Sequence, residues 1–338
     1  MKIGIDGMGG DNAPAEVVKG AVEASKQIED EIILFGDQDT LLSHLAAYTY
    51  NKEQIRVSHA ADVISNHDAP VRSVRTKTES SMVKGIQAVK EEEIDVFISA
   101  GNTGALMAGG LFILGRIPGI DRPALATVLP SIIGSKPMLL LDSGANSECK
   151  PGNLLEFGVM GSIYMNRVLG VSRPQIGLVN IGAEETKGTT VTKAAYELLS
   201  KSKVKFIGNV EARDIPTGPC DVLVCDGFVG NVILKLTEGV ALSLLKLLKD
   251  KFTEGTKAKL GAFLLLDKFK DLKTMLDYSE YGGAPILGVK GALVKMHGSS
   301  NANAVKNTIL KARPYVENHV VRTIHDEVLS IEDTELEE

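Results

Sequence analysis

The sequence predicts an α/β protein with three layers, α/β/α, around a mostly parallel β-sheet. Short runs rich in Val, Ile and Leu alternate with segments of helical periodicity along most of the 338 residues. Most of these runs are continuously apolar, which is typical of strands buried on both faces of a parallel sheet. Many of the 34 glycines stand where such a run gives way to a helix, as tight turns require. We therefore expect right-handed crossovers and one catalytic unit over residues 1–329 with a central cleft.

The order of the elements follows from these patterns. The apolar runs predict strands over 2–6, 31–35, 94–99, 137–142, 175–180, 204–208 and 221–226. The helical patterns predict helices over 13–27, 76–90, 103–114, 153–169, 188–199 and 301–324. Thr76 and Glu79 have the spacing of a capping box, so the second of these helices is expected to begin there.

Polar loops follow five of the predicted strands. In a parallel sheet the carboxyl ends of the strands share one edge, and ligands bind there. We therefore expect a shared cleft, although Gly, Asn and Asp are also ordinary turn formers. The residues predicted to line it, besides those discussed below, are Asp6, Gly9, Gly10, Asp11, Asn12, Asp142, Asn146, Glu184 and His297.

The loop at 99–105 is the clearest candidate for binding an anion. An apolar strand ends, Gly101 and Gly104 flank Asn102 and Thr103, and a helix of small residues begins. Free backbone N–H groups and the positive end of a helix then point at one place, which suits phosphate. These four residues are therefore predicted to bind phosphate.

The first loop resembles a dinucleotide-binding turn but lacks its third glycine. A G-x-G-x-x-G sequence that begins at Gly7 would need glycine at position 12, which is Asn12. This departure argues against a nicotinamide cofactor, while backbone contacts to an anion stay possible.

Nucleophiles and metal ligands are poorly represented. There is no G-x-S-x-G elbow, and the sequence has no H-x-x-x-H or C-x-x-C spacing. Cys225 ends a strand that we expect to be buried, and Cys149 and Cys220 have no neighbour in the sequence that would lower a thiol pKa. We expect no metal site, no bound cofactor and no covalent intermediate. Direct transfer to or from phosphate, through positioning and charge stabilisation, fits the remaining groups.

Two further groups of basic residues stand near predicted loops. Lys187 lies in a loop that opens a helix, where an ammonium could hold phosphate and offset charge on an attacked carbonyl. Arg72, Arg75 and Lys77 form a cluster ahead of a helix that could dock phosphate or an acidic partner. Each group could equally be a solvated surface.

The composition argues against some classes of binding partner and some cellular locations. The net charge is −6, Trp is absent and aromatic residues make up 5% of the chain, all of which argue against nucleic acid. Three cysteines in so long a chain indicate a reducing compartment, and we expect no signal peptide and no membrane-spanning segment. The protein is therefore expected to be cytoplasmic.

The segment 235–278 differs from the rest of the chain. Its apolar residues recur with i, i+4 spacing, and between 246 and 273 eight lysines outnumber four acidic residues. Such helices could pack on the body, on a second subunit or on an anionic membrane. A predicted acidic, flexible tail follows over 330–338.

Six motifs resemble those of the bacterial acyl-ACP:phosphate acyltransferases of phospholipid synthesis. They are residues 1–14 (MKIGIDGMGGDNAP), 99–105 (SAGNTGA), 141–146 (LDSGAN), 180–188 (NIGAEETKG), 225–231 (CDGFVGN) and 281–288 (YGGAPILG). The resemblance covers the chain from Met1 to about Leu329 and leaves out the acidic tail.

The resemblance implies a fold similar to the isocitrate and isopropylmalate dehydrogenases and the phosphotransacetylases. It implies transfer of a long fatty acyl group from acyl carrier protein, which brings the phosphopantetheine, to inorganic phosphate. It also implies a cytoplasmic homodimer at the inner face of the membrane, near a glycerol-3-phosphate acyltransferase. Membrane contact through Phe263, Leu264, Leu265 and Leu266 then becomes the preferred interpretation of the basic helical segment.

Within this activity the sequence suggests roles for single residues. Phosphate would attack the thioester directly, with Lys187, Asn180 and Asn231 orienting the reactants and stabilising the oxyanion. Asp226 and Asp6 would position those groups. Three alternatives stay open: a short-chain phosphate acyltransferase that uses coenzyme A, an NAD-dependent dehydrogenase of similar fold, and a non-enzymatic scaffold for membrane and carrier protein.

Overall fold

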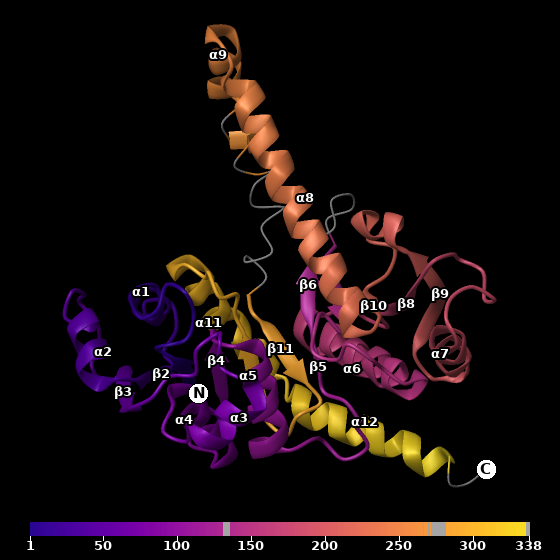
Figure 1. Cartoon of the computed structure of the whole chain (residues 1–338), viewed down its shortest axis with the longest axis horizontal. Coiled ribbons are helices and arrows are strands. Elements are labelled where there is room, and N and C mark those ends of the chain that lie inside the picture. Colours follow the sequence, from indigo (N-terminus) through magenta and orange to yellow (C-terminus); the bar gives the residue numbers. More distant parts are fainter. Residues whose placement is uncertain (131–135, 266, 270, 272–281, 336–338) are drawn as a thin grey trace.

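Two β-sheets lie side by side and carry the rest of the chain (Figure 1). The computed structural model describes residues 1–130, 136–265, 267–269, 271 and 282–335. The larger sheet has the order β3-β2-β1-β4-β12-β11-β5 and the smaller one β6-β7-β10-β8-β9. The strands of the larger sheet are β1 (Lys2–Asp6), β2 (Glu31–Gly36), β3 (Ile55–His59), β4 (Val96–Ser99), β5 (Ala124–Leu125), β11 (Ala284–Leu287) and β12 (Ala292–Lys295). Those of the smaller sheet are β6 (Thr127–Leu129), β7 (Met138–Leu141), β8 (Gln175–Asn180), β9 (Lys205–Glu211) and β10 (Val222–Val224).

Most neighbouring strands are parallel, and the antiparallel pairs are confined to the middle of the molecule. They are β11 with β12, β11 with β5, and β6 with β7. Only Ala126 separates β5 from β6, so the chain passes directly from one sheet to the other. The carboxyl ends of the parallel strands in both sheets can therefore border one central cleft.

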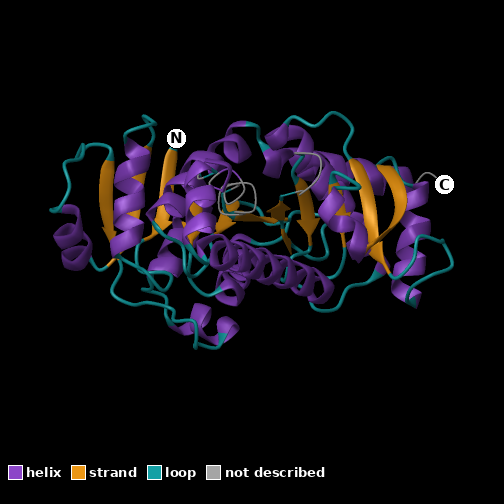
Figure 2. Cartoon of the chain, turned by 90° about the horizontal axis from the view of Figure 1, so that it is seen from above, coloured by secondary structure: helices purple, strands orange, loops and turns teal. Residues whose placement is uncertain are grey.

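Helices cover both faces of the sheets, which gives the predicted α/β/α layers (Figure 2). They are α1 (Ala15–Ser25), α2 (Gln38–Leu45), α3 (Pro70–Thr76), α4 (Ser81–Lys90), α5 (Thr103–Gly109), α6 (Pro151–Leu169), α7 (Thr190–Lys201), α8 (Gly227–Thr253), α9 (Thr256–Leu264), α11 (Ala302–Glu317) and α12 (Val320–Glu335). A π-helical turn, η1 (Gly110–Leu114), continues α5, and a 3₁₀ turn, η2 (Ala212–Thr217), follows β9. One hydrophobic cluster extends through both sheets, from Ile5 in β1 to Leu141 in β7 and Leu178 in β8. This shared core holds the two halves of the cleft at a fixed separation.

The seven predicted strands are present, as β1, β2, β4, β7, β8, β9 and β10. The sequence prediction omits β3 and the central strands β5, β6, β11 and β12. Those central strands have two to four residues each, which is too short for an apolar run to stand out from a loop.

The prediction of one helix over 76–90 is wrong. Pro70 starts α3 and Lys77 ends it, and α4 begins only at Ser81. The side chain of Ser80 caps α4 by accepting from the Val83 N–H, so the predicted capping box does not form. Pro70 at the first helical position explains the earlier start, because its fixed φ favours a helix N-terminus.

The predicted helix over 301–324 is also two helices. Asn318 ends α11, and His319, with a φ of 51°, turns the chain into α12. Because α12 continues to Glu335, the predicted acidic tail is helical up to that residue. Residues 336–338 lie outside the described part of the chain.

Helix α8 projects from the body like an arm, and α9 folds back at its far end (Figure 1). Helix α8 has 27 residues and contains an 18-residue stretch with a mean hydropathy of 1.5, so it is long and apolar enough to cross a membrane, contrary to the sequence prediction. Its first turns nevertheless belong to the cleft, where Asn231, Lys235 and Glu238 line a cavity. The length and composition of α8 are therefore compatible with a role inside the protein.

The start of α8 is fixed against the second sheet by two glycines. A Cβ on Gly230 would clash with the carbonyl oxygen of Asp142, and one on Gly227 would lie 2.8 Å from the backbone of Asn146. Only a residue without a side chain lets α8 approach the β7 loop this closely.

We expect Gly230→Ala to lower the free energy of unfolding by roughly 1–3 kcal/mol, because α8 or the β7 loop must move to admit the methyl group. Gly152→Ala in α6, where a Cβ meets nothing within 4 Å, is the matched control and should change it by less than about 0.5 kcal/mol. Urea unfolding followed by circular dichroism measures both. Equal stability of the two variants would contradict the close approach of α8.

Candidate functional site

A cavity of about 320 Å³ lies where the two sheets meet. Its wall combines residues from α5, the β5–β6 junction, the β7 loop, α8 and the end of β12. The polar residues in this wall are Thr103, Thr127, Ser143, Asn231, Lys235, Glu238, Lys295 and His297. Of the predicted site residues, Thr103, Asn231 and His297 are among them.

Lys295 is the cation of this cavity that is most deeply buried, with a relative exposure of 8%. It ends β12, which pairs with β4 so that Lys295 lies opposite Ser99. Its Nζ donates to the carbonyl oxygen of Met296. Burial lowers the pKa of Lys295 to about 8, and the charges of Asp6 and Asp11 act against this fall. At neutral pH the side chain is therefore a cation whose proton is held less tightly than usual.

Asp6 is a structural hub behind this lysine. Its carboxylate accepts from the hydroxyls of Ser81 and Ser99, at 2.6 and 2.7 Å, and from the Met8 N–H at 3.3 Å. Burial raises the pKa of Asp6, while these hydrogen bonds and Lys295 favour the ionised form. A Cβ on Gly9 would collide with this carboxylate. Asp6 therefore joins β1, β4 and α4 and supplies the opposite charge for Lys295. Its hydrogen-bond partners are Ser81, Ser99 and Met8 rather than Lys187, Asn180 and Asn231, so the predicted role in positioning those three residues stays a prediction.

Asn102 holds the chain around the predicted phosphate loop. Its Oδ1 caps α5 by accepting from the Ala105 N–H at 3.0 Å. Its Nδ2 donates to the carbonyl oxygens of Ser65 and Asp68, at 3.2 and 3.3 Å. The amide group is thus committed to the protein, and Thr103 is the residue of this loop that lines the cavity. Gly101 packs close to Ser99 and Asp6, and Gly104 against Pro70.

Asp142 organises the opposite wall. Its carboxylate is fully buried and accepts from the backbone N–H groups of Leu125, Gly144, Ala145 and Asn146. The Asn146 side chain completes this arrangement by donating to Asp142 and to the Pro123 carbonyl. These bonds leave Ser143 in the cavity wall, where its hydroxyl lies 2.7 Å from that of Thr127.

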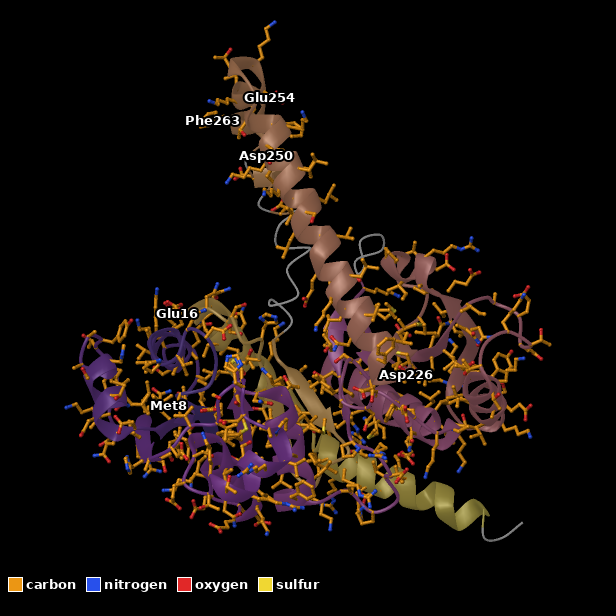
Figure 3. The ribbon with its side chains drawn as sticks, in the orientation of Figure 1. Met8, Glu16, Asp226, Asp250, Glu254 and Phe263 are labelled. Atoms are coloured by element: carbon orange, nitrogen blue, oxygen red, sulfur yellow. The ribbon has the colours of Figure 1, made fainter. Side chains whose placement is uncertain are left out.

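Helix α8 supplies a third wall. Asp226 caps its start by accepting from the Val229 N–H at 2.8 Å, and it lies at the base of the arm (Figure 3). Asn231, Lys235 and Glu238 follow at helical spacing and line the cavity. Burial raises the pKa of Glu238, while His297 and Lys235 act in the other direction, so these charges influence one another across the cavity.

The first loop borders the site without lining this cavity. The Asp11 N–H donates to the Gly298 carbonyl at 2.8 Å, and Asn12 donates to the carbonyls of Ser299 and Ser300. Gly10, at a φ of 102°, passes close to Ala100 and Gly298. The loop therefore fixes the segment that carries His297.

Lys187, Asn180 and Glu184 are grouped at the end of β8, outside the cavity wall. Asn180 donates to the Lys187 carbonyl and to Asn209, at 3.2 and 3.1 Å, and so closes the loop on itself. The backbone carbonyl of Glu184 accepts a hydrogen bond from the Asn209 side-chain amide at 2.9 Å. Lys187 is exposed. The structure does not bring these residues to Lys295, and their catalytic role stays a prediction.

The predicted basic cluster is divided. Lys77 is bound to the Val63 carbonyl and to Asp68, at 2.8 and 2.9 Å, and Asp68 raises its pKa. Arg72 and Arg75 are exposed on α3, and Arg75 stacks over the ring of Phe112 at 4.9 Å. Only the two arginines therefore present charge to a partner.

The apolar residues predicted to meet a membrane lie at the far end of the arm, as Phe263 shows in Figure 3. Phe263, Leu264 and Leu265 are 68%, 75% and 45% exposed. Leu266 lies outside the described residues.

The thiols are poorly suited to nucleophilic attack. Burial raises the pKa of both Cys149 and Cys220 to about 12, and that of Cys225 well above its usual value. Within the described ranges, no group of three or more His, Cys, Asp and Glu side chains could hold a metal ion.

The polar residues of the cavity wall that the sequence prediction missed are Lys295, Thr127, Ser143, Lys235 and Glu238. Lys295 ends an apolar run, ALVK, that resembles the other strands followed by polar loops. Recognition of β12 would have added Lys295 to the candidates, whereas Glu238 could be found only once α8 was placed against the cleft.

Comparison with known proteins identifies the family of the chain. A family model described as "Fatty acid synthesis protein" matches residues 1–323. The chain belongs to this family. It is 55% identical over its full length to the phosphate acyltransferase of Alkaliphilus oremlandii, whose whole length is also covered. It is 53% identical over 96% of its length to that of Clostridium acetobutylicum, covering 98% of the relative. The resemblance found in the sequence motifs is thus confirmed at the level of the family.

Solved structures agree on the fold. A phosphotransacetylase from Streptococcus pyogenes superposes with a TM-score of 0.63 at 15% identity, covering 94% of each chain. A branched-chain phosphotransacylase from Enterococcus faecalis gives a TM-score of 0.57 at 15% identity, covering 94% of this chain and all of the other. The predicted similarity to the phosphotransacetylase fold is therefore confirmed.

The opposing charge of Asp6 predicts a measurable change at Lys295. We expect Asp6→Asn to move the pKa of Lys295 below its value of about 8, because a carboxylate that stabilises the ammonium is removed. Titration of the lysine side chains by NMR, with the Lys295 signal assigned from its loss in Lys295→Met, measures this. Asp37→Asn, at the cap of α2, is the control and should leave the value unchanged. An unaltered pKa in Asp6→Asn would contradict the coupling.

Proposed function

We propose that this protein transfers a long-chain fatty acyl group from acyl carrier protein to inorganic phosphate and releases an acyl phosphate for phospholipid synthesis. The observation that carries the proposal is the buried Lys295 cation in a cavity lined by hydroxyl and amide groups. Such a site binds a small anion and stabilises charge that develops beside it. Membership in the family supports phosphate as the acceptor.

Phosphate occupies the side of the cavity formed by the larger sheet. Lys295 neutralises its charge, and the Thr103 hydroxyl and the backbone N–H groups at the start of α5 donate to its oxygens. Asn102 keeps this helix start in place through its cap and its bonds to the loop at 65–68. Asn102 is therefore a positioning residue.

The reaction needs no covalent enzyme intermediate. An oxygen of hydrogen phosphate attacks the thioester carbonyl carbon, whose C=O electrons move onto oxygen to form a tetrahedral oxyanion. The Lys295 ammonium and the Asn231 side-chain amide, which both line the cavity, would stabilise this charge. The oxyanion then collapses, the C–S bond breaks, and the leaving thiolate takes the proton of the phosphate hydroxyl. Acyl phosphate and the thiol of the phosphopantetheine arm are the products. The raised pKa values of the Cys149 and Cys220 thiols, which keep both protonated at neutral pH, support this direct route.

The arm suggests how the protein is assembled. Val232 and Leu247 lie on one stripe of α8, and each is more than half exposed. A second copy of this chain, packed stripe to stripe, would remove this apolar surface from water, so we propose a homodimer. Arg72 and Arg75 would dock the acidic carrier protein.

The tip of the arm fits a membrane surface. Phe263, Leu264 and Leu265 are exposed next to a segment with a net positive charge. We propose that the protein is cytoplasmic and touches the inner face of the membrane, where a glycerol-3-phosphate acyltransferase would take up the product.

Lys295→Met is expected to lower kcat/KM by about a hundredfold or more while the protein stays folded, because it removes the buried cation. Acyl phosphate formed from hexadecanoyl-ACP and phosphate is the measurement, and coenzyme A thioesters and NAD⁺ test the alternative activities. Lys187→Ala should lose less activity, since Lys187 is exposed outside the cavity. Full activity of Lys295→Met would overturn the assignment of Lys295 as the main cation of the site. A larger loss of activity in Lys187→Ala than in Lys295→Met would assign that role to Lys187 in the β8 loop.

Replacement of Leu264 and Leu265 by Glu should abolish binding to vesicles that contain anionic lipid, because two charges replace exposed apolar contacts. Co-sedimentation measures this, light scattering verifies the dimer, and activity in solution should persist. Leu42→Glu, at an exposed leucine of α2, is the control. Undiminished sedimentation of the tip variant would refute the membrane contact.

A further inference from the structure

A second cavity of about 240 Å³ adjoins the first one and differs from it in character. It lies between the lower half of α8, the end of β6 and η2. Its wall is almost entirely apolar, and Thr237 and Glu238 are its polar members. The apolar residues are Leu129, Pro130, Ala212, Ile215, Pro216, Ile233, Leu234, Leu236, Val240, Ala241 and Leu244.

The two cavities share part of their wall. Leu234 and Glu238 line both of them, since successive turns of α8 pass from one to the other. One face of α8 carries Asn231, Lys235 and Glu238 into the polar cavity, and a neighbouring face carries Ile233, Ala241 and Leu244 into the apolar one. A molecule whose reactive end lies beside Lys295 can thus extend an apolar portion along η2.

We propose that this apolar groove holds the acyl chain of the donor, with the thioester carbonyl in the polar cavity. The inference rests on the proposed function. With a volume of about 240 Å³ and an almost entirely apolar wall, the groove accommodates several methylene groups of the chain. Burial of each methylene contributes about 0.8 kcal/mol, so the groove favours donors long enough to fill it.

The geometry also indicates where a longer chain goes. Leu236, Val240 and Leu244 stand at the groove and are 64%, 57% and 46% exposed, so the groove opens along the arm. Carbons beyond those held at η2 would follow this apolar surface toward the far end of α8. The groove therefore orients the chain away from the sheets, and Ala241 stands where added volume would obstruct it.

The test is Ala241→Phe, which narrows the groove without touching the polar cavity. We expect kcat/KM for hexadecanoyl-ACP to fall at least tenfold, while that for butanoyl-ACP changes by less than about twofold. Leu242→Phe, on the next residue of the same helix, is the matched control: Leu242 is 68% exposed and lies outside the groove wall, so both donors should keep their rates. Thermal unfolding and light scattering verify that each variant is folded and associated as in the wild type.

The outcomes separate the two proposals. If the wild type forms no acyl phosphate from either donor, the proposed function fails. If the wild type is active but Ala241→Phe loses both donors equally or neither of them, the groove assignment is overturned and the function stands. A second measurement uses hexadecanoyl-ACP with a photoreactive diazirine on the chain. Labelling of the η2 segment or of α8 near Ala241 supports the groove, and labelling confined to other elements overturns it.

Discussion

The cleft depends on the buried carboxylate of Asp6, whose charge must be compensated by neighbouring groups. Asp6 ends β1 with almost no exposure, and a charge in that position is costly unless hydrogen bonds and an opposite charge compensate it. Ser81 in α4 and Ser99 in β4 supply the hydrogen bonds, and Lys295 in β12 supplies the opposite charge. One requirement for charge balance thereby aligns three neighbouring strands. It also leaves an ammonium group facing the cavity with few competing partners, which makes it available to an anionic substrate.

In the second sheet a buried carboxylate is compensated mainly by backbone N–H groups. Asp142 is buried as fully as Asp6, but its partners are the Asn146 side-chain amide and the backbone N–H groups of Leu125 and of the loop that follows β7. The carboxylate therefore shapes a loop and presents no charge to the cavity. This difference makes the site asymmetric: one wall carries the cation, and the other carries neutral hydroxyl and amide groups such as Ser143 and Asn231. The cation suits phosphate, and the neutral hydroxyl and amide groups suit a polarised carbonyl.

Sequence patterns were sufficient for the outer parts of the fold and insufficient for its centre. Long apolar strands such as β1 and β8 are visible because burial on both faces leaves continuous runs. The central strands have only two to four residues, so Lys295 at the end of β12 was not predicted, whereas Thr103 and His297 in the same cavity were. Asn102 shows the opposite error. Its position after a strand correctly predicted a helix start, but the sequence could not reveal that its amide is committed to Ser65 and Asp68, which are far away in the chain. Tertiary partners decide whether a polar group is available, and local pattern does not contain them.

Helix α8 joins these walls to the rest of the substrate. With about 3.6 residues per turn, a helix presents different faces to different neighbours. In α8, Asn231 and Lys235 face the polar cavity, Ile233 and Ala241 face the apolar groove, and Val232 and Leu247 face outward. The face toward the polar cavity requires polar residues, whereas the faces toward the groove and toward the outside require apolar ones. For this reason α8 is apolar enough to cross a membrane although it begins inside the cleft. Because the base of α8 packs closely against the Asp142 backbone at Gly230, the packing beside the cavity sets the direction in which the arm, and any chain that follows it, leaves the protein.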